Sequence, residues 1–116
     1  MSEVVQKATL ASQAALPLAS VTTEDKNQAL LMMADALIEH ADTIITANTE
    51  DIERGRAGGT SESLLDRLRL DTKRVTDIAE GLRQIVQLND PIGELLEVIK
   101  RPNGLHIEKI RVPIGV

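Results

Sequence analysis

The side chains best suited to acid–base chemistry in this 116-residue chain are four carboxylates in its central part, Asp51, Glu53, Asp66 and Asp71. Two carboxylates can act as general acid and general base when burial or a neighbouring charge separates their pKa values. Each of the four instead stands where a helix cap, a partner for the helix dipole or a surface salt bridge is expected. The spacing therefore favours solvated helix faces, and we assign no catalytic role to these residues.

Histidines and serines offer weaker alternatives. His40 and His106 are far apart, and neither has a second ligand at the spacing typical of a metal site. His40 is expected at the C-terminus of a helix and His106 on an exposed strand. Ser61 and Ser63 have no histidine nearby in the sequence and stand where a helix begins. These patterns indicate neither a metal ion nor a serine nucleophile.

The glycines and the missing residue types narrow the chemistry further. Gly55, Gly58 and Gly59 follow a helical pattern and lack the lysine–hydroxyl pair of a phosphate loop, so we interpret them as the end of a helix. The chain has no cysteine, which excludes disulfides and a nucleophilic thiol within these residues. It has no aromatic residue for stacking on bases. We therefore assign no catalytic, cofactor-binding or metal-binding residue in this sequence.

Charge and hydropathy indicate a cytoplasmic protein. The formal net charge of -5 argues against binding to nucleic acids or to anionic membranes, which attract basic patches. No run approaches the roughly 18 apolar residues that span a bilayer. The first residues lack the basic start and the apolar core of a signal peptide.

The first ninety residues have helical periodicity. Ser2 is expected to cap the first helix, and Pro17 to end it. The hydroxyls of Thr22 and Thr23 are expected to cap the second helix. This second helix has the clearest apolar stripe of the chain, formed by Leu30, Met33, Ala34, Leu37, Ile38 and Ala41.

Three more helices are expected before residue 90. Asp42 is predicted to cap the first of them, with a kink at Asn48, whose side chain competes for backbone hydrogen bonds. A short helix over residues 62–68 follows, and Asp71 or Thr72 caps a long helix that runs to Asn89. One face of the long helix is expected to hold Val75, Ile78, Ala79, Leu82, Ile85 and Val86.

The last part of the chain has the pattern of a β-hairpin. A turn cluster over residues 89–93 ends the helical period, and Pro102-Asn103-Gly104 predicts a tight primed turn between two strands. In the second strand, the alternation of apolar residues shifts by one position between Ile107 and Ile110. This shift predicts a bulge, a crossover or a change of environment. Because an isolated hairpin is marginal in water, its edges are expected to pair outside this chain or on another subunit.

The final residues, 110–116, form an apolar, strand-like run with no cap, turn or polar tail. Such a run is typical of a strand that enters a buried sheet. We therefore expect this chain to be the front part of a longer protein, truncated at a strand.

Four segments together carry a family resemblance. They are Ala47-Asn48-Thr49-Glu50-Asp51-Ile52, the Leu64–Leu70 run, Asp90-Pro91-Ile92-Gly93 and Arg111-Val112-Pro113-Ile114-Gly115-Val116. In this order and spacing they resemble the amino-terminal portion of gamma-glutamyl phosphate reductase, also called glutamate-5-semialdehyde dehydrogenase. The resemblance covers essentially all 116 residues.

The resemblance implies the α/β fold of the aldehyde dehydrogenase superfamily, of which this chain would be a mostly α-helical part with a C-terminal β-hairpin. Residues 1–90 would be the helical front of the cofactor-binding domain. Residues 91–112 would be a hairpin of the oligomerisation arm, and residues 113–116 the start of a strand of the cofactor-binding sheet.

The resemblance also implies an activity. Such a reductase uses NADPH to reduce L-glutamate 5-phosphate to L-glutamate 5-semialdehyde and phosphate, in proline biosynthesis, through a cysteine thiolate. The resemblance implies a homo-oligomer joined through the hairpin arm. Without a cysteine, this chain alone is expected to be inactive and to bind no NADPH. The competing hypothesis is a small acidic helical module that binds a partner protein through its hairpin edge.

Overall fold

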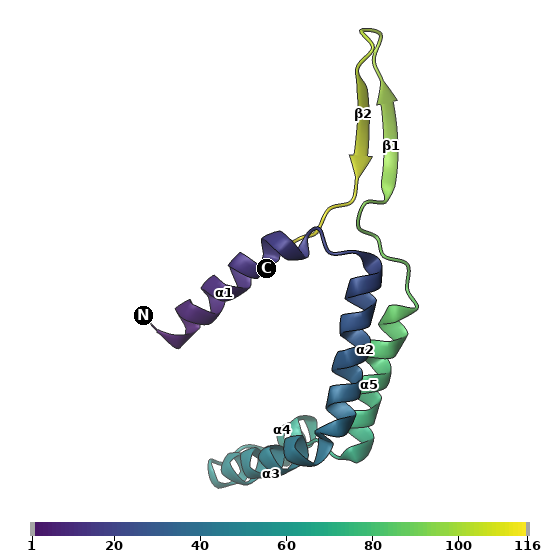
Figure 1. Cartoon of the computed structure of the whole chain (residues 1–116). Helices are drawn as coiled ribbons and strands as arrows, with labels where there is room; N and C mark the ends of the chain where they lie inside the picture. Colours follow the sequence, from purple (N-terminus) through teal and green to yellow (C-terminus); the bar gives the residue numbers. More distant parts are fainter. Residues whose placement is uncertain (1, 116) are drawn as a thin grey trace. The chain divides into compact units, whose positions relative to one another are not determined.

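A computed structural model describes residues 2–115 of the chain, which form five α-helices followed by a two-stranded antiparallel sheet (Figure 1). The predicted helical segment with a C-terminal hairpin is therefore confirmed. The chain divides into two compact units, residues 2–26 with 89–115 and residues 27–88. The elements are α1 Glu3–Leu18, α2 Thr23–Glu39, α3 Ala41–Ala57, α4 Glu62–Leu68, α5 Thr72–Val86, β1 Leu95–Lys100 and β2 His106–Ile110.

Side-chain caps explain where four of the helices begin. Each cap oxygen accepts a hydrogen bond from a backbone N–H of the first turn, which would otherwise lack a partner. The capping residues are Ser2 for α1, Thr22 for α2, Ser61 for α4 and Asp71 for α5. Each lies at a position where the sequence predicts a cap.

The start of α3 differs from the prediction. Only His40 separates α2 from α3, and α3 already begins at Ala41. Asp42 therefore does not occupy the extended position before the helix that an N-cap requires. Asp42 lies instead in the first turn of α3, where its charge complements the helix dipole. The cap predicted at Asp42 is therefore wrong, although a helix does begin there.

Helix α3 is continuous through Asn48, so the predicted kink is wrong. The Asn48 side chain is only 8% exposed and bonds to another segment rather than to its own helix. Its Nδ2 donates to Leu68 O at 2.9 Å, and its Oδ1 accepts from Leu70 N at 2.8 Å. Because both polar groups of the amide are satisfied there, Asn48 does not compete with the α3 backbone.

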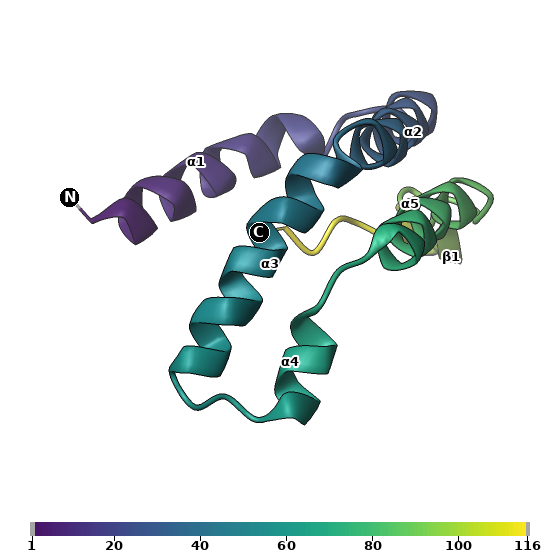
Figure 2. The same ribbon diagram turned by 90° about the horizontal axis from the view of Figure 1, so that it is seen from below.

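The core of residues 27–88 is small. Helices α3 and α4 lie side by side, and α3 also contacts α5 (Figure 2). The face of α5 that packs is narrower than predicted, because Ile78 and Ile85 are each 48% exposed. The helix also ends at Val86 rather than at Asn89. The buried apolar residues are Ala34, Ile52, Leu65, Val75 and Ala79.

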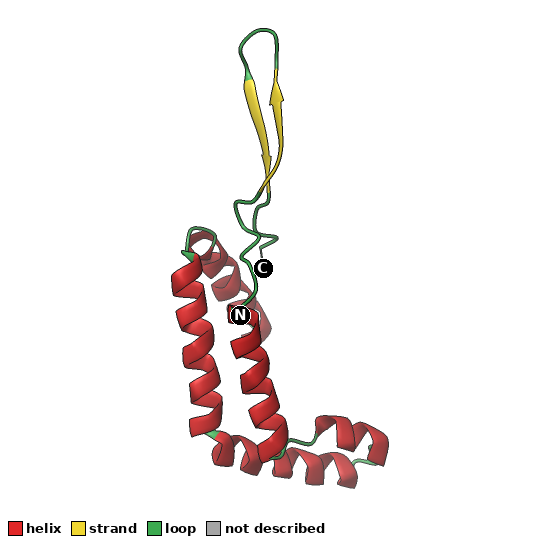
Figure 3. Ribbon diagram, turned by 90° about the vertical axis from the view of Figure 1, so that its right-hand side faces the viewer, coloured by secondary structure: helices red, strands yellow, loops and turns green. Residues whose placement is uncertain are grey.

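The other unit, residues 2–26 with 89–115, contains no residue as buried as these. Helix α1 buries none of its side chains, and it includes Pro17 in its last turn instead of ending there. The strands β1 and β2 form the hairpin shown in yellow in Figure 3. Within residues 2–115, no helix is long and apolar enough to cross a membrane.

The hairpin is confirmed, but its turn is not the primed two-residue turn that the sequence predicted. Such a turn would pair residue 102 with Leu105, and Pro102 has no N–H to donate. Arg101 N donates to Leu105 O at 2.9 Å instead, and Gly104 N donates to Arg101 O at 3.0 Å. Gly104 alone in this loop has a positive φ, 86°, as in three-residue hairpin loops.

The predicted irregularity in the hairpin is a bulge. Leu95 pairs with Ile110 and Glu97 with Lys109, so Leu96 is the extra residue. The bulge lies opposite Lys109 and Ile110, next to the point where the alternation of apolar residues in β2 changes. The extra residue is on β1 rather than on β2.

Candidate functional site

The four carboxylates considered for acid–base chemistry do not form one site. Asp51 pairs with Arg54 at 2.9 Å within α3, and Asp71 caps α5. Asp66 accepts from Arg74 at 3.3 Å, and Glu53 lies exposed on α3. Three of the four therefore have a structural partner on the surface.

The histidines and serines are also dispersed. His40 lies between α2 and α3, and His106 lies on β2 with its Nε2 3.1 Å from Glu108 Oε1. Ser61 is the cap of α4, and Ser63 lies exposed in its first turn. In residues 2–115, no three side chains of the metal-binding types come close enough together to hold an ion.

Gly58 and Gly59 end α3, as the sequence predicts, whereas Gly55 lies inside its last turn. Gly58 caps the helix, and Gly59 follows with a φ of 85°. Gly55 also permits close packing, because a Cβ there would lie 3.0 Å from Leu65 Cδ2. Their roles are thus in the turn and the contact between α3 and α4.

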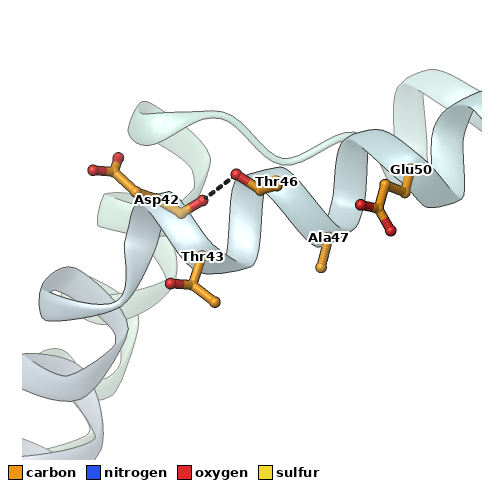
Figure 4. Close-up of a pocket in the computed structure, with 5 residues that line it drawn as sticks. All are labelled: Asp42, Thr43, Thr46, Ala47 and Glu50. Carbon is orange, nitrogen blue, oxygen red and sulfur yellow. Dashed lines mark hydrogen bonds between the residues drawn. The ribbon is translucent and has the colours of Figure 1, made fainter.

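A shallow depression on α3 does not enclose a ligand. Figure 4 shows that its side chains project from a single helix, and Thr46 Oγ1 donates back to Asp42 O at 2.8 Å. One helix face supplies no opposing wall. The residues around the depression are Asp42, Thr43, Thr46, Ala47 and Glu50.

A second hollow, of about 230 Å³, lies between the end of α1 and the residues that follow β2. Lys26 is the only charged side chain that lines it, and its ammonium group already contacts Asp90. A ligand site needs several converging polar groups, and the one charged group among the described lining residues is already paired with Asp90. The remaining lining residues are Ala15, Leu18, Ala19, Ile92, Pro113 and Gly115.

The most densely bonded side chain of the unit that holds the hairpin is Asp90, in the turn cluster before β1. Its Oδ2 accepts from Thr23 Oγ1 at 2.8 Å and from Lys26 Nζ, and its Oδ1 accepts from Ile92 N at 3.0 Å. The bond from Lys26, followed by those from Ile92 and Thr23, lowers the pKa of Asp90 from 3.8 to about 2. These contacts tie the turn to the first turn of α2.

Sequence reasoning identified Asp90 only as a turn residue. Thr23 lies 67 residues away, so no local pattern joins the two. The available signal was an acid in a turn cluster and a lysine one turn into a capped helix, and many unpaired surface residues give the same signal.

A second set of bonds fixes the foot of the hairpin. Arg111 Nε donates to Glu94 Oε2 at 2.9 Å, and Arg111 N donates to Glu94 O at 3.0 Å. Arg111 O in turn accepts from Gly93 N at 2.9 Å. The two strands therefore remain paired beyond the end of the sheet.

The hairpin has a set of exposed apolar side chains, here called the hairpin surface. Its side chains are 38–51% exposed. Each strand also has one edge without a partner among the described residues. Apolar side chains next to open strand edges are the features that strand pairing with another chain uses. The hairpin surface comprises Leu95, Leu96, Val98, Ile99, Ile107 and Ile110.

Comparison with known proteins identifies relatives over the whole chain. The chain is 52% identical over 116 residues to the gamma-glutamyl phosphate reductase of Oceanobacillus iheyensis. It is 53% identical over 116 residues to that of Anoxybacillus flavithermus. Each alignment covers 100% of this chain and 28% of the relative. The chain is homologous to the amino-terminal part of gamma-glutamyl phosphate reductases.

Solved structures agree with this relationship. The fold matches a crystal structure of gamma-glutamyl phosphate reductase from Thermotoga maritima with a TM-score of 0.91 and 37% identity, over 97% of this chain and 27% of that chain. The reductase from Saccharomyces cerevisiae matches with a TM-score of 0.87 and 28% identity, over 97% of this chain and 29% of that chain. No family model matches the chain. The chain spans about 28% of the length of the curated reductases.

Two of the segments that resemble gamma-glutamyl phosphate reductases contact each other. Asn48, in the first segment, holds the backbone at both ends of the Leu68–Leu70 stretch, in the second. From α5, Arg74 donates to Asp66 O and to Arg69 O, which caps the end of α4. Asn48, from the first of these segments, and Arg74, from α5, thus hold the connection from α4 to α5.

Proposed function

We propose that this chain is the amino-terminal segment of an NADPH-dependent reductase in proline biosynthesis. The reductase converts L-glutamate 5-phosphate to L-glutamate 5-semialdehyde and phosphate, in the cytoplasm. The observation that supports this most directly is the identity of about 50% to reductases of that name along the full length of the chain.

Within such an enzyme, we assign this segment a structural role. The chain has no cysteine, so it does not supply the thiolate that the family resemblance implies. Its carboxylates make caps and surface pairs rather than a converging site. The segment contributes packed helices and the hairpin, and the reacting groups belong to other parts of the enzyme.

A hybrid enzyme tests this proposal. The matching segment of the Oceanobacillus iheyensis reductase is replaced by this chain, and oxidation of NADPH is followed with L-glutamate 5-phosphate as the substrate. We expect the hybrid to retain activity, because 52% identity over the exchanged segment preserves its packing. A soluble, folded hybrid without activity would contradict the proposal. This chain alone, assayed in parallel, is expected to oxidise no NADPH.

We further propose that the hairpin surface pairs with a second subunit. Support comes from its apolar side chains and from the open strand edges. A two-stranded hairpin is marginal in water by itself, and pairing would bury these side chains and extend the sheet. The firm base formed by Glu94 and Arg111 would hold the hairpin in position for that contact.

Sedimentation tests the pairing. Ile99 and Ile107 are direct cross-strand partners, so changing both to lysine places two like charges side by side on the hairpin surface. We expect the hybrid enzyme with this double change to lose its subunit assembly. Val4→Lys is the matched control, because Val4 is 76% exposed on α1 and lies outside the hairpin surface. Unchanged assembly in the double variant would show that the hairpin surface does not pair.

A further inference from the structure

The tip of the hairpin contains a sequence with reactivity of its own. The chain has four asparagines, and only Asn103 is followed by a glycine. Asn103 is exposed, in the loop between β1 and β2. An asparagine side chain can be attacked by the backbone nitrogen of the next residue, and a following glycine leaves that nitrogen unshielded.

The local geometry favours this attack. Asn103 Oδ1 accepts from Leu105 N at 3.1 Å, which folds the side chain back over the intervening Gly104 amide and polarises its C=O bond. Gly104 has a φ of 86°, and a Cβ built on it would meet no atom within 4 Å. The side of Gly104 on which a Cβ would stand is therefore open.

We propose that Asn103 is a site of spontaneous deamidation. The deprotonated Gly104 nitrogen forms a bond to Asn103 Cγ, and the bond from Cγ to Nδ2 breaks. Ammonia leaves with the proton that Gly104 gave up, and a succinimide ring remains. Water then opens the ring at Cγ to give aspartate, or at the backbone carbonyl to give isoaspartate, so that water and ammonia balance the change.

The hairpin itself controls the rate of this reaction. Gly104 N donates to Arg101 O at 3.0 Å, and this bond must open before the nitrogen can attack. The turn therefore protects Asn103 while it is closed, and each local opening of the tip exposes it. The rate reports how often the tip opens.

The other asparagines are placed less favourably. Asn48 is 8% exposed, and both polar groups of its amide are bonded within the fold. Asn27 lies inside α2, where the helix holds the following amide. Asn89 is exposed, but Asp90 follows it and its side chain crowds the nitrogen. Asn89 is thus the matched internal comparison for Asn103.

The product changes the hairpin. Isoaspartate adds one methylene group to the main chain inside the loop that the Arg101–Gly104 and Arg101–Leu105 bonds close. Either product also adds a negative charge. The longer main chain of isoaspartate weakens the pairing of β1 with β2, and, if the proposed role of the hairpin surface holds, it weakens subunit pairing as the protein ages.

Peptide mass spectrometry tests the proposal. The protein is incubated at neutral and at mildly alkaline pH, digested, and the peptides that contain each asparagine are compared over time. We expect the Asn103 peptide to gain the mass of an amide-to-acid change several times faster than the Asn89 peptide. The rate should rise with hydroxide concentration and in urea, and isoaspartate should be the main product.

Two comparisons keep the test decisive. Gly104→Asn tolerates the positive φ but shields the nitrogen, so it should slow conversion at Asn103. Equal rates at Asn103 and Asn89 in the unchanged protein would overturn the proposal, and that comparison needs no variant. The mass change does not depend on the proposed reductase function, so the two can fail separately.

Discussion

Of the side chains that bond to backbone groups within residues 2–115, Asn48 reaches the partners that lie furthest from it in the sequence. Asparagine is unfavourable inside a helix because its side chain competes for local hydrogen bonds. Here Leu68 and Leu70, 20 and 22 residues further along, occupy both groups of the amide. Asn48 therefore fixes the connection between α4 and α5 from the side of α3.

Replacing Asn48 by alanine should destabilise the protein by about 1–3 kcal/mol, because Leu68 O and Leu70 N lose their partner in a partly buried site. Urea unfolding measures this change. Thr49→Ala, which removes only an exposed bond to Ile45 O, is the control and should stay within about 0.5 kcal/mol of the unchanged protein. Equal losses in the two variants would show that Asn48 does not hold the connection.

Asp90 gives a prediction about pH. Its pKa is about 2 in the folded chain and 3.8 ordinarily, so the ionised carboxylate stabilises the fold above about pH 3.8. That contribution is lost as the pH falls toward 2. Lys26→Met should raise the pKa of Asp90 toward 3.8, because the bond from Lys26 is the largest cause of the shift.

A titration of the Asp90 carboxyl carbon by NMR checks this. Thr23→Val is the matched variant, and it should raise the pKa of Asp90 less than Lys26→Met does, since the Thr23 bond is a smaller cause. If the midpoint stayed near pH 2 in the Lys26 variant, the contact between Lys26 and Asp90 would not be present in solution.

At the scale of elements, the sequence correctly predicts the helix starts and ends that depend on residues close together in the chain. The caps at Ser2, Ser61 and Asp71 bond to amides three residues further on, so the local pattern contains both partners. The short helix Glu62–Leu68 has the predicted bounds for the same reason. Propensity and capping are short-range, and these elements depend on little else.

The predictions that are wrong concern local structure that depends on a hydrogen-bond partner far along the chain or on a backbone donor that is missing. The kink at Asn48 was predicted because Leu68 and Leu70 were not recognised as its partners. The primed turn was predicted from Asn103 and Gly104 without the missing N–H of Pro102. For the candidate site, the apolar hairpin was predictable from its period, whereas the bonds that hold the turn at Asp90 join residues far apart in the sequence.

Helix α4 depends on one buried side chain. Its seven residues are too few for stability alone, and Leu65 is 1% exposed whereas Leu64 is 54% exposed. Leu65→Ala should therefore lower the free energy of unfolding by about 2–5 kcal/mol. Leu64→Ala, a chemically identical change, should cost far less. Urea unfolding of the two variants gives the comparison, and similar losses would contradict the packing of α4.

At the scale of the whole molecule, burial is unevenly distributed. Among residues 2–115, every buried residue, including the polar Asn48, lies in residues 27–88. In the described part of the other unit, α1 buries no side chain, and every residue of β1 and β2 is exposed. Stability within one chain is rarely uniform, and segments with few buried apolar contacts open at low free energy.

Amide hydrogen exchange should therefore separate the two units. Amides in the middle of α3 and α5 should exchange slowly, because they open only when the core around Leu65 and Val75 opens. Amides of α1 should exchange fast at every protein concentration. Those of β1 and β2 should become slower as concentration rises, since pairing of the hairpin surface with a second copy would protect their open edges. Protection of α1 equal to that of α5 in dilute solution would contradict the uneven burial. Exchange rates of β1 and β2 that do not depend on concentration would contradict only the proposed pairing of the hairpin surface.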